Sequence, residues 1–187
     1  MGCVHIAIAD IVESRIEFAL DHGFADAGTV VSSKRPASLE ESISSAKATA
    51  ASICDLRLES DKILGRTDVT FECTGVESCI QAALYTTKSG GKVALVGMGT
   101  PNVTMPLSEA SAREIDLIPV WRYANCYPQA LELADATRDS ASAARLAKLI
   151  THRYEGLEHV PTALQTACVP ADGNGQMVLK VVVSNSR

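Results

Sequence analysis

The stretch 68-DVTFECTGVESCIQAALYTTKSGGKVALVGMG-99 carries the strongest structural pattern in the sequence. Its start, residues 68–75, is a β-prone run that ends in small residues, as buried parallel strands often do. Residues 76–91 are predicted to form a helix that ends at Gly90 and Gly91. Residues 92–99 form an apolar run with glycines at its end. This order favours two parallel strands joined by a helical crossover.

The same alternation of strand and helix continues on both sides of that stretch. At the start of one predicted helix, Ser38 and Glu41 have the spacing of a capping box. The further predicted elements are strands at 4–9, 28–31, 114–123 and 176–183, and helices at 13–23, 38–57, 128–136 and 157–168. Together they predict an α/β fold with a parallel sheet and helices on both faces.

The composition is ordinary for a soluble globular protein: 187 residues, 47% hydrophobic and 21% charged, with a net charge of -5. Since no basic cluster occurs, neither nucleic-acid binding nor a membrane-surface patch is supported. The apolar runs are strand-sized and shorter than a membrane helix. No secretory leader opens the chain, and none of the six cysteines forms a C-x-x-C pair. We therefore expect a cytoplasmic protein with reduced thiols.

In parallel sheets, ligands bind beside the carboxyl ends of the strands. The residues that directly follow an apolar run, at or just after the end of a predicted strand, are Asp10, Cys73–Gly75, Val96–Gly99 and Arg122–Tyr123. Gly97 and Gly99 favour a close approach of backbone to ligand, although glycines at a strand end are also common turn residues. The small residues of ECTG, Glu72 to Gly75, are consistent either with a cofactor edge passing over them or with a tight strand-to-helix turn.

Asp10 is the first candidate binding residue. A carboxylate at the end of a strand in a nucleotide-binding unit accepts both hydroxyls of an adenosine ribose, and it repels a 2′-phosphate, which favours NAD over NADP. The alternative is that Asp10 caps the following helix. Arg15, in the first turns of that helix, either reaches the ribose and adenine or lies solvated on the helix face.

Two expected motifs do not occur in the sequence. No G-x-G-x-x-G turn, which holds a pyrophosphate in dinucleotide-binding folds, is present. No Cys, His and carboxylate residues have the spacing of a catalytic zinc site, and the four histidines are scattered.

The chain resembles the coenzyme-binding half of zinc-dependent medium-chain dehydrogenases of the sorbitol dehydrogenase type, which include fungal xylitol and L-arabinitol dehydrogenases. The stretches that carry the resemblance are IADIVESRIEFALDHGFAD (8–26), residues 68–99, SAREIDLIPVWRYANCYPQALELA (111–134) and ITHRYEGLEHVPTALQTA (150–167). They cover most of the chain in the family's order.

The resemblance implies a role for each matching residue. Asp10 and Arg15 match the pair around the adenosine ribose. The residues that match the nicotinamide side of the cofactor are Val96, Gly97 and Met98 at one strand end, and Val120, Trp121 and Arg122 at the next. Arg122 and Tyr123 match residues that also face the polyol substrate. The reaction implied is reversible hydride transfer between a polyol and NAD, with a zinc ion polarising the oxygen.

Compared with this family, the chain lacks the GroES-like domain that supplies the zinc ligands. It also lacks the first strand and glycine turn of the coenzyme domain. We therefore expect an incomplete Rossmann-type doubly wound parallel sheet. Residues 1–155 would form a truncated NAD-binding domain, and residues 156–187 a helix and strand that in the family return to the catalytic domain. Residues 31–66 are longer and richer in Ser and Ala than the family usually shows.

Three hypotheses about function follow. The first is the coenzyme-binding portion of a polyol dehydrogenase, inactive as an isolated chain and a homo-oligomer or a partner of full-length homologues. The second is a non-catalytic module that binds a nucleotide or docks to intact dehydrogenase subunits. The third is a shortened product that does not fold stably.

Overall fold

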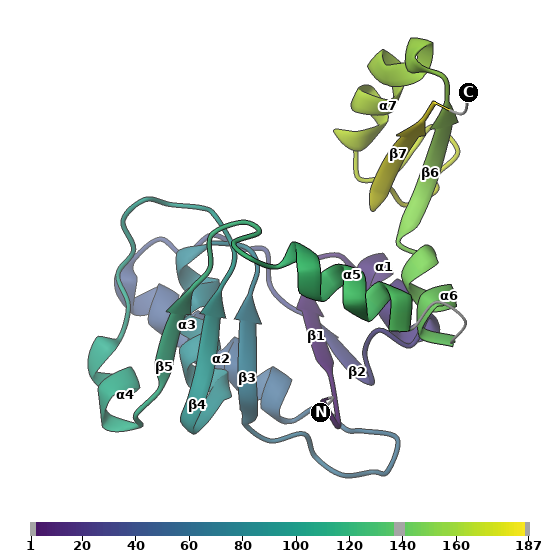
Figure 1. Cartoon of the computed structure of the whole chain (residues 1–187). Coiled ribbons are helices and arrows are strands. Elements are labelled where there is room, and N and C mark those ends of the chain that lie inside the picture. The colour runs from purple at the N-terminus through teal and green to yellow at the C-terminus, as the bar shows by residue number, and fades with distance from the viewer. Residues whose placement is uncertain (1–2, 137–140, 186–187) are drawn as a thin grey trace. The chain divides into compact units, whose positions relative to one another are not determined.

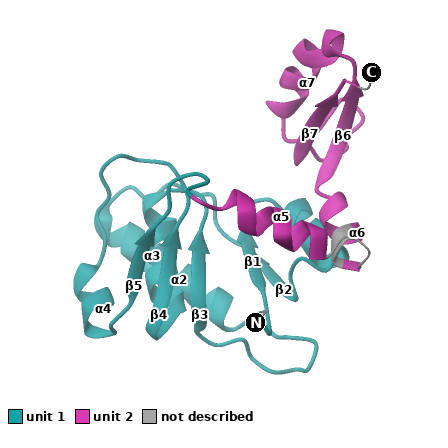
Figure 2. Ribbon diagram, in the orientation of Figure 1, with its two compact units in different colours: residues 1–124 teal, residues 125–187 magenta. Residues whose placement is uncertain are grey.

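The structure is a computed structural model that describes residues 3–136 and 141–185. The chain divides into two compact units, residues 1–124 and residues 125–187, which Figure 2 shows in different colours. Each unit is described by itself.

Unit 1 alternates strands and helices, and every strand pair in it is parallel. Its elements are β1 (Ala7–Asp10), α1 (Glu13–Asp21), β2 (Ala27–Val30), α2 (Leu39–Cys54), β3 (Thr67–Glu72), α3 (Glu77–Thr86), β4 (Thr87–Leu95), α4 (Leu107–Ala112) and β5 (Asp116–Pro119), drawn in Figure 1. β1 pairs with β2, and the other three strands form a sheet in the order β3-β4-β5. The predicted α/β class with parallel strands is confirmed.

The core of unit 1 lies between α3 and the β3-β4-β5 sheet. Leu84 of α3 and Val93 of β4 are fully buried. They form a cluster with Ala83, Ala110 and Ile115, against which Leu95, Met105 and Leu117 pack. Because Leu95 and Leu117 lie in β4 and β5, this cluster fixes the strands whose ends follow at residues 96 and 120.

Helix α2, in the Ser- and Ala-rich region 31–66, is an integral part of unit 1. Its small residues Ala46 and Ala50 are buried, so α2 and α3 pack closely. The buried Ser42 hydroxyl donates a 2.8 Å hydrogen bond to the Gln81 side chain of α3. The Gln81 amide in turn donates to the Thr104 carbonyl oxygen. The unusual composition of this region therefore serves helix packing.

We expect Ser38→Ala to destabilise unit 1 by about 1 kcal/mol. Ser38 is the N-cap residue of α2, and its hydroxyl accepts a hydrogen bond from the Glu41 amide at 3.2 Å. The substitution leaves that amide without its partner. Urea unfolding monitored by circular dichroism measures the change. Ser44→Ala, on the exposed surface of the same helix, is the matched control, and an equal loss in both variants would contradict the prediction.

Helix α3 is shorter than predicted. The expected helix end at Gly90 and Gly91 is wrong, since α3 ends at Thr86 and residues 87–91 belong to β4. The Arg113 guanidinium donates to the carbonyl oxygens of Leu84 and Thr87, and so caps the last turn of the helix. A distant side chain therefore ends α3, with no need for the glycines that follow.

Unit 2 is built around one parallel strand pair, β6 with β7. Its elements are α5 (Tyr127–Ala136), α6 (Ala141–Ala147), β6 (Ile150–Glu155), the 3₁₀ helix η1 (Leu157–His159), α7 (Val160–Ala167) and β7 (Lys180–Ser184). The sequence pattern did not predict β6 or α6, nor α4 of unit 1. The strand predicted at 176–183 is β7, which begins only at residue 180. Gln176 lies in a turn instead, where its backbone N–H donates a hydrogen bond to the Asp172 carboxylate.

Among the described residues, none of the helices has both the length and the apolar character that crossing a membrane requires.

Candidate functional site

The predicted site residues lie at the carboxyl ends of the parallel strands of unit 1. In Figure 1, β1, β3, β4 and β5 point in the same direction, so that their ends face the same side of the unit. The residues form two groups. Asp10 and Arg15 lie at the end of β1, whereas residues 96–98 and 120–123 follow β4 and β5.

Asp10 is the last residue of β1, and its carboxylate remains partly open to solvent. One carboxylate oxygen, Oδ1, accepts a hydrogen bond from the Val12 amide at 2.9 Å. Arg15 Nη1 lies 3.5 Å from each of the two oxygens, and the Asp10 and Arg15 side chains are 26% and 43% exposed. The N-cap residue of α1 is Val12, so Asp10 does not cap that helix. An accessible carboxylate beside a guanidinium suits a ligand that carries hydroxyl groups.

The segments after β3 and β4 touch backbone to backbone. The Val96 and Gly97 amides donate to the Glu72 carbonyl oxygen at 2.8 and 2.9 Å. A Cβ atom on Gly97 would lie 2.1 Å from the Gly75 nitrogen and 2.4 Å from the Thr74 nitrogen, so only glycine fits there. Met98 follows with an exposed side chain. The two strand ends thus form one continuous backbone surface.

Glu72, the last residue of β3, begins the stretch ECTG that the sequence pattern singled out for its small residues, but the pattern assigned no role to its side chain. Its side chain is buried and turns back over the segment that follows the strand. The carboxylate accepts hydrogen bonds from the Thr74 amide at 2.8 Å and the Gly75 amide at 2.9 Å, and one from the Thr74 hydroxyl. The signal in the sequence is an acidic residue inside a β-prone run, directly before a turn of small residues.

Cys73 lies in the same turn, and its side chain is exposed at one side. Partial desolvation by the surrounding chain raises the pKa of the Cys73 thiol above its ordinary value, and the nearby negative charge of Glu72 acts in the same direction. Because the thiolate is the reactive form of cysteine, this position is a poor nucleophile near neutral pH.

The segment after β5 presents large exposed side chains. The Val120 amide continues the strand pairing by donating to the Leu95 carbonyl oxygen at 3.0 Å. Trp121 and Tyr123 are exposed. The Arg122 guanidinium carbon lies 5.2 Å from the centre of the Trp121 ring, in a cation–π contact. Arg122 has a φ of 49°, which turns the chain sharply at this point.

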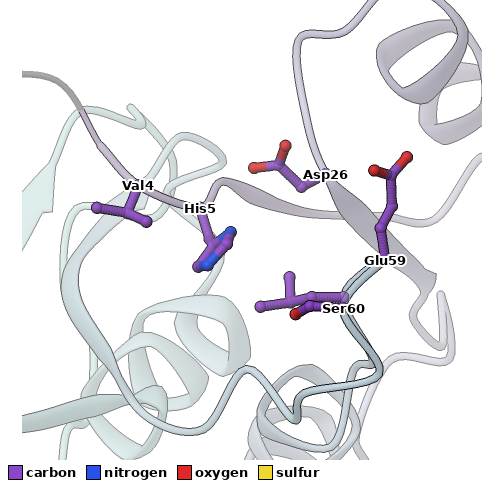
Figure 3. A pocket seen from close by; sticks show the side chains of 6 residues that line it. Val4, His5, Asp26, Glu59 and Ser60 are labelled. Carbon is purple, nitrogen blue, oxygen red and sulfur yellow. The ribbon is translucent and has the colours of Figure 1, made fainter.

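An open hollow of about 270 Å³ lies elsewhere in unit 1 (Figure 3). It is lined by Val4, His5, Asp26, Leu58, Glu59 and Ser60. Since His5 precedes β1 and Asp26 precedes β2, the hollow lies at the amino ends of these strands, away from the predicted site. Across residues 3–136 and 141–185, no three His, Cys, Asp or Glu side chains gather as they would around a metal ion.

Comparisons with known proteins match this architecture. The family model described as zinc-binding dehydrogenase matches residues 1–136. Sorbitol dehydrogenase of Gallus gallus is 31% identical over 186 residues, covering 93% of this chain and 46% of that protein. L-arabinitol 4-dehydrogenase of Hypocrea jecorina is 38% identical over 117 residues, covering 63% of this chain and 28% of that protein.

A solved structure of an Escherichia coli alcohol dehydrogenase complexed with NADH has a similar fold. It superposes with a TM-score of 0.65 at 18% identity, covering 97% of this chain and 44% of that one. This likeness supports the predicted partial Rossmann-type fold. The chain spans about half the length of the curated sorbitol dehydrogenases that it matches, 46% in the case above. It belongs to the zinc-binding dehydrogenase family, and it is similar to the C-terminal part of medium-chain dehydrogenases of the sorbitol dehydrogenase type.

Proposed function

We propose that this chain is the coenzyme-binding portion of an NAD-dependent dehydrogenase in the cytoplasm that acts on polyols of the sorbitol, xylitol or L-arabinitol type. The observation that carries the proposal is Asp10 at the end of β1, open to solvent and paired with Arg15. The names of the relatives support the polyol class, and the NADH complex of a neighbour with the same fold supports the cofactor.

In this proposal different residues bind different parts of the cofactor. The Asp10 carboxylate accepts the two ribose hydroxyls and repels a 2′-phosphate, and Arg15 lies against the adenosine. The segments Val96–Met98 and Val120–Arg122 border the nicotinamide, which accepts or gives up the hydride when bound. Arg122 and Tyr123 face the polyol or ketose. The tight contact of Gly97 with Gly75 fits this role, since it leaves backbone rather than side chains at the strand ends.

We propose no turnover by the 187-residue chain alone. Its sequence contains neither the G-x-G-x-x-G turn nor the spacing of a catalytic zinc site. Zinc is therefore assigned to the family and to no residue of this chain.

We expect NAD to raise the melting temperature of the purified chain, and Asp10→Ala to abolish that rise. At a hundredfold excess over the dissociation constant, a ligand stabilises the folded state by about 2.7 kcal/mol. Removing the carboxylate removes the acceptor for the ribose hydroxyls. Differential scanning fluorimetry with millimolar NAD measures the shift, and NADP should raise the melting temperature of the unmodified chain less.

Asp116→Ala provides the matched control for the loss of a carboxylate. Asp116 begins β5 at the opposite end of the sheet and pairs with Lys92. This variant should keep the full NAD-dependent rise. If NAD leaves the melting temperature of the unmodified chain unchanged, the cofactor proposal is wrong.

A second candidate function is an interaction module that docks to intact dehydrogenase subunits or to a second copy. The favouring observation is apolar surface on the β3-β4-β5 sheet. Phe71, Ala94 and Ile118 are register partners on one face, where Phe71 and Ile118 are exposed on either side of the buried Ala94. Among the described residues, β1 and β3 each pair with a strand on one edge only. Exposed apolar strands and open edges favour association.

A further inference from the structure

Glu72 is an acidic side chain in a place that normally disfavours charge. It is 4% exposed, and the donors that reach its carboxylate within the described part of the chain are two backbone amides and one hydroxyl. Burying an ionised group is costly unless hydrogen bonds satisfy it. Here every one of those donors belongs to the two residues Thr74 and Gly75. The carboxylate therefore acts on a single local feature, the turn that follows β3.

The same residue also connects that turn to the end of β4. Its carbonyl oxygen accepts the amides of Val96 and Gly97, while its carboxylate accepts the amides of Thr74 and Gly75. Glu72 thus fixes the backbone on both sides of the contact between Gly75 and Gly97. A small movement of the turn after β3 would also move the segment after β4, because the two backbones are too close to slide past one another.

The position of this contact indicates which half of a dinucleotide it serves. In the proposed site, Asp10 at the end of β1 binds the adenosine half. Among the described strands, β1 pairs only with β2, and β3 and β4 belong to the second sheet of unit 1, whose strands point in the same direction as β1 (Figure 1). The other half of the dinucleotide then extends over the carboxyl ends of that second sheet, since ligands bind at such ends. The surface at the ends of β3 and β4 is made by residues 73–75 and 96–99, and Glu72 holds both.

We propose that Glu72 is a positioning residue for the nicotinamide end of the cofactor site. It acts through the backbone of residues 73–75 and 96–97 rather than by touching the cofactor. This inference rests on the proposed NAD-binding function. It goes beyond that function by assigning a role to a buried acid at the end of β3.

The test compares the binding of NAD with that of ADP-ribose, which lacks the nicotinamide ring, by isothermal titration calorimetry. Glu72→Gln keeps the shape of the side chain but replaces an acceptor oxygen with an NH₂ group that faces an amide donor. We expect this variant to bind NAD about tenfold more weakly than the unmodified chain does. Its affinity for ADP-ribose should stay within about twofold of that of the unmodified chain. The reason is that the variant loses the carboxylate that accepts two backbone amides, and it loses it only at the nicotinamide end of the site.

Two further variants separate positioning from general stability. Thr74→Val removes the hydroxyl that donates to Glu72 and accepts the Val76 amide, and it keeps the Glu72 carboxylate. It should therefore weaken NAD binding by a smaller factor and leave ADP-ribose binding unchanged. Glu77→Gln is the matched control, since Glu77 lies in α3 and its carboxylate likewise accepts a backbone amide, that of Thr104, at 2.7 Å. It should change neither affinity.

The outcomes are distinguishable from one another. Equal losses of NAD and ADP-ribose binding in the Glu72 and Thr74 variants would show a merely structural role and overturn the inference. Unchanged NAD binding in both variants would also overturn it. If the unmodified chain binds neither ligand, the proposed function itself fails. If it binds ADP-ribose as tightly as NAD, the nicotinamide makes no contact and the positioning role is wrong.

Discussion

Gly97→Ala is expected to destabilise unit 1 by about 3 kcal/mol or more, at the upper end of what overpacking costs. The added methyl group would lie 2.1 Å from the Gly75 nitrogen and 2.4 Å from the Thr74 nitrogen. Both obstacles are backbone atoms, which cannot rotate away as a flexible side chain would. The turn after β3 must move, and the amides that Glu72 holds move with it.

Thermal and urea unfolding measure this loss, with Gly173→Ala as the matched control. A Cβ atom on Gly173 meets no atom within 4 Å, so the same substitution should be nearly neutral there. A fall in melting temperature of about 10 °C is expected for the Gly97 variant. NAD should also no longer raise the melting temperature of this variant, because the strand-end surface is displaced. Equal stability of the two variants would contradict the close contact between the strand ends.

The sequence was sufficient to predict the parts of the fold that depend on local pattern. Apolar runs bounded by turn residues indicated β1, β3 and β4, and the position of Asp10 directly after such a run placed it at a strand end. The Ser38 cap was also predictable, because it depends on residues three apart. These features need no knowledge of distant contacts.

Features fixed by distant contacts were not predictable in this way. The end of α3 depends on Arg113, a residue far along the chain, and no local signal at Thr86 shows it. Strand β6 has the sequence ITHRYE, which lacks the apolar run by which the other strands were predicted. Its pairing with β7 makes it a strand.

The candidate site shows the same division. Asp10 and the strand-end glycines follow from residue type and position in the sequence. Glu72 does not, because acidic residues are almost always exposed and pattern reasoning treats them so. The hydrogen bonds from Thr74 and Gly75 that allow this acid to be buried are visible only in the three-dimensional structure.

Leu84→Ala should destabilise unit 1 by about 2–5 kcal/mol, the usual cost of removing a large side chain from a core. Leu84 is 0% exposed and packs in the cluster with Val93 and Ile115, between α3 and the sheet. The cavity cannot fill from solvent or collapse easily, since α3 is held at its end by Arg113. This loss is a large fraction of the roughly 5–15 kcal/mol that stabilises a typical domain.

The urea midpoint, with the slope of the transition unchanged, is the measurement that checks this prediction. Leu107→Ala is the matched control, because Leu107 also lies in a helix but is 58% exposed, and its loss should cost less than about 1 kcal/mol. Similar losses in the two variants would mean that the α3 core does not hold unit 1 together. If the core does hold it, the Leu84 variant at low temperature should still gain stability from NAD, because Leu84 lies in the core rather than at the strand ends. That separates its effect from the effect of Gly97→Ala, in which stability and cofactor binding should be lost together.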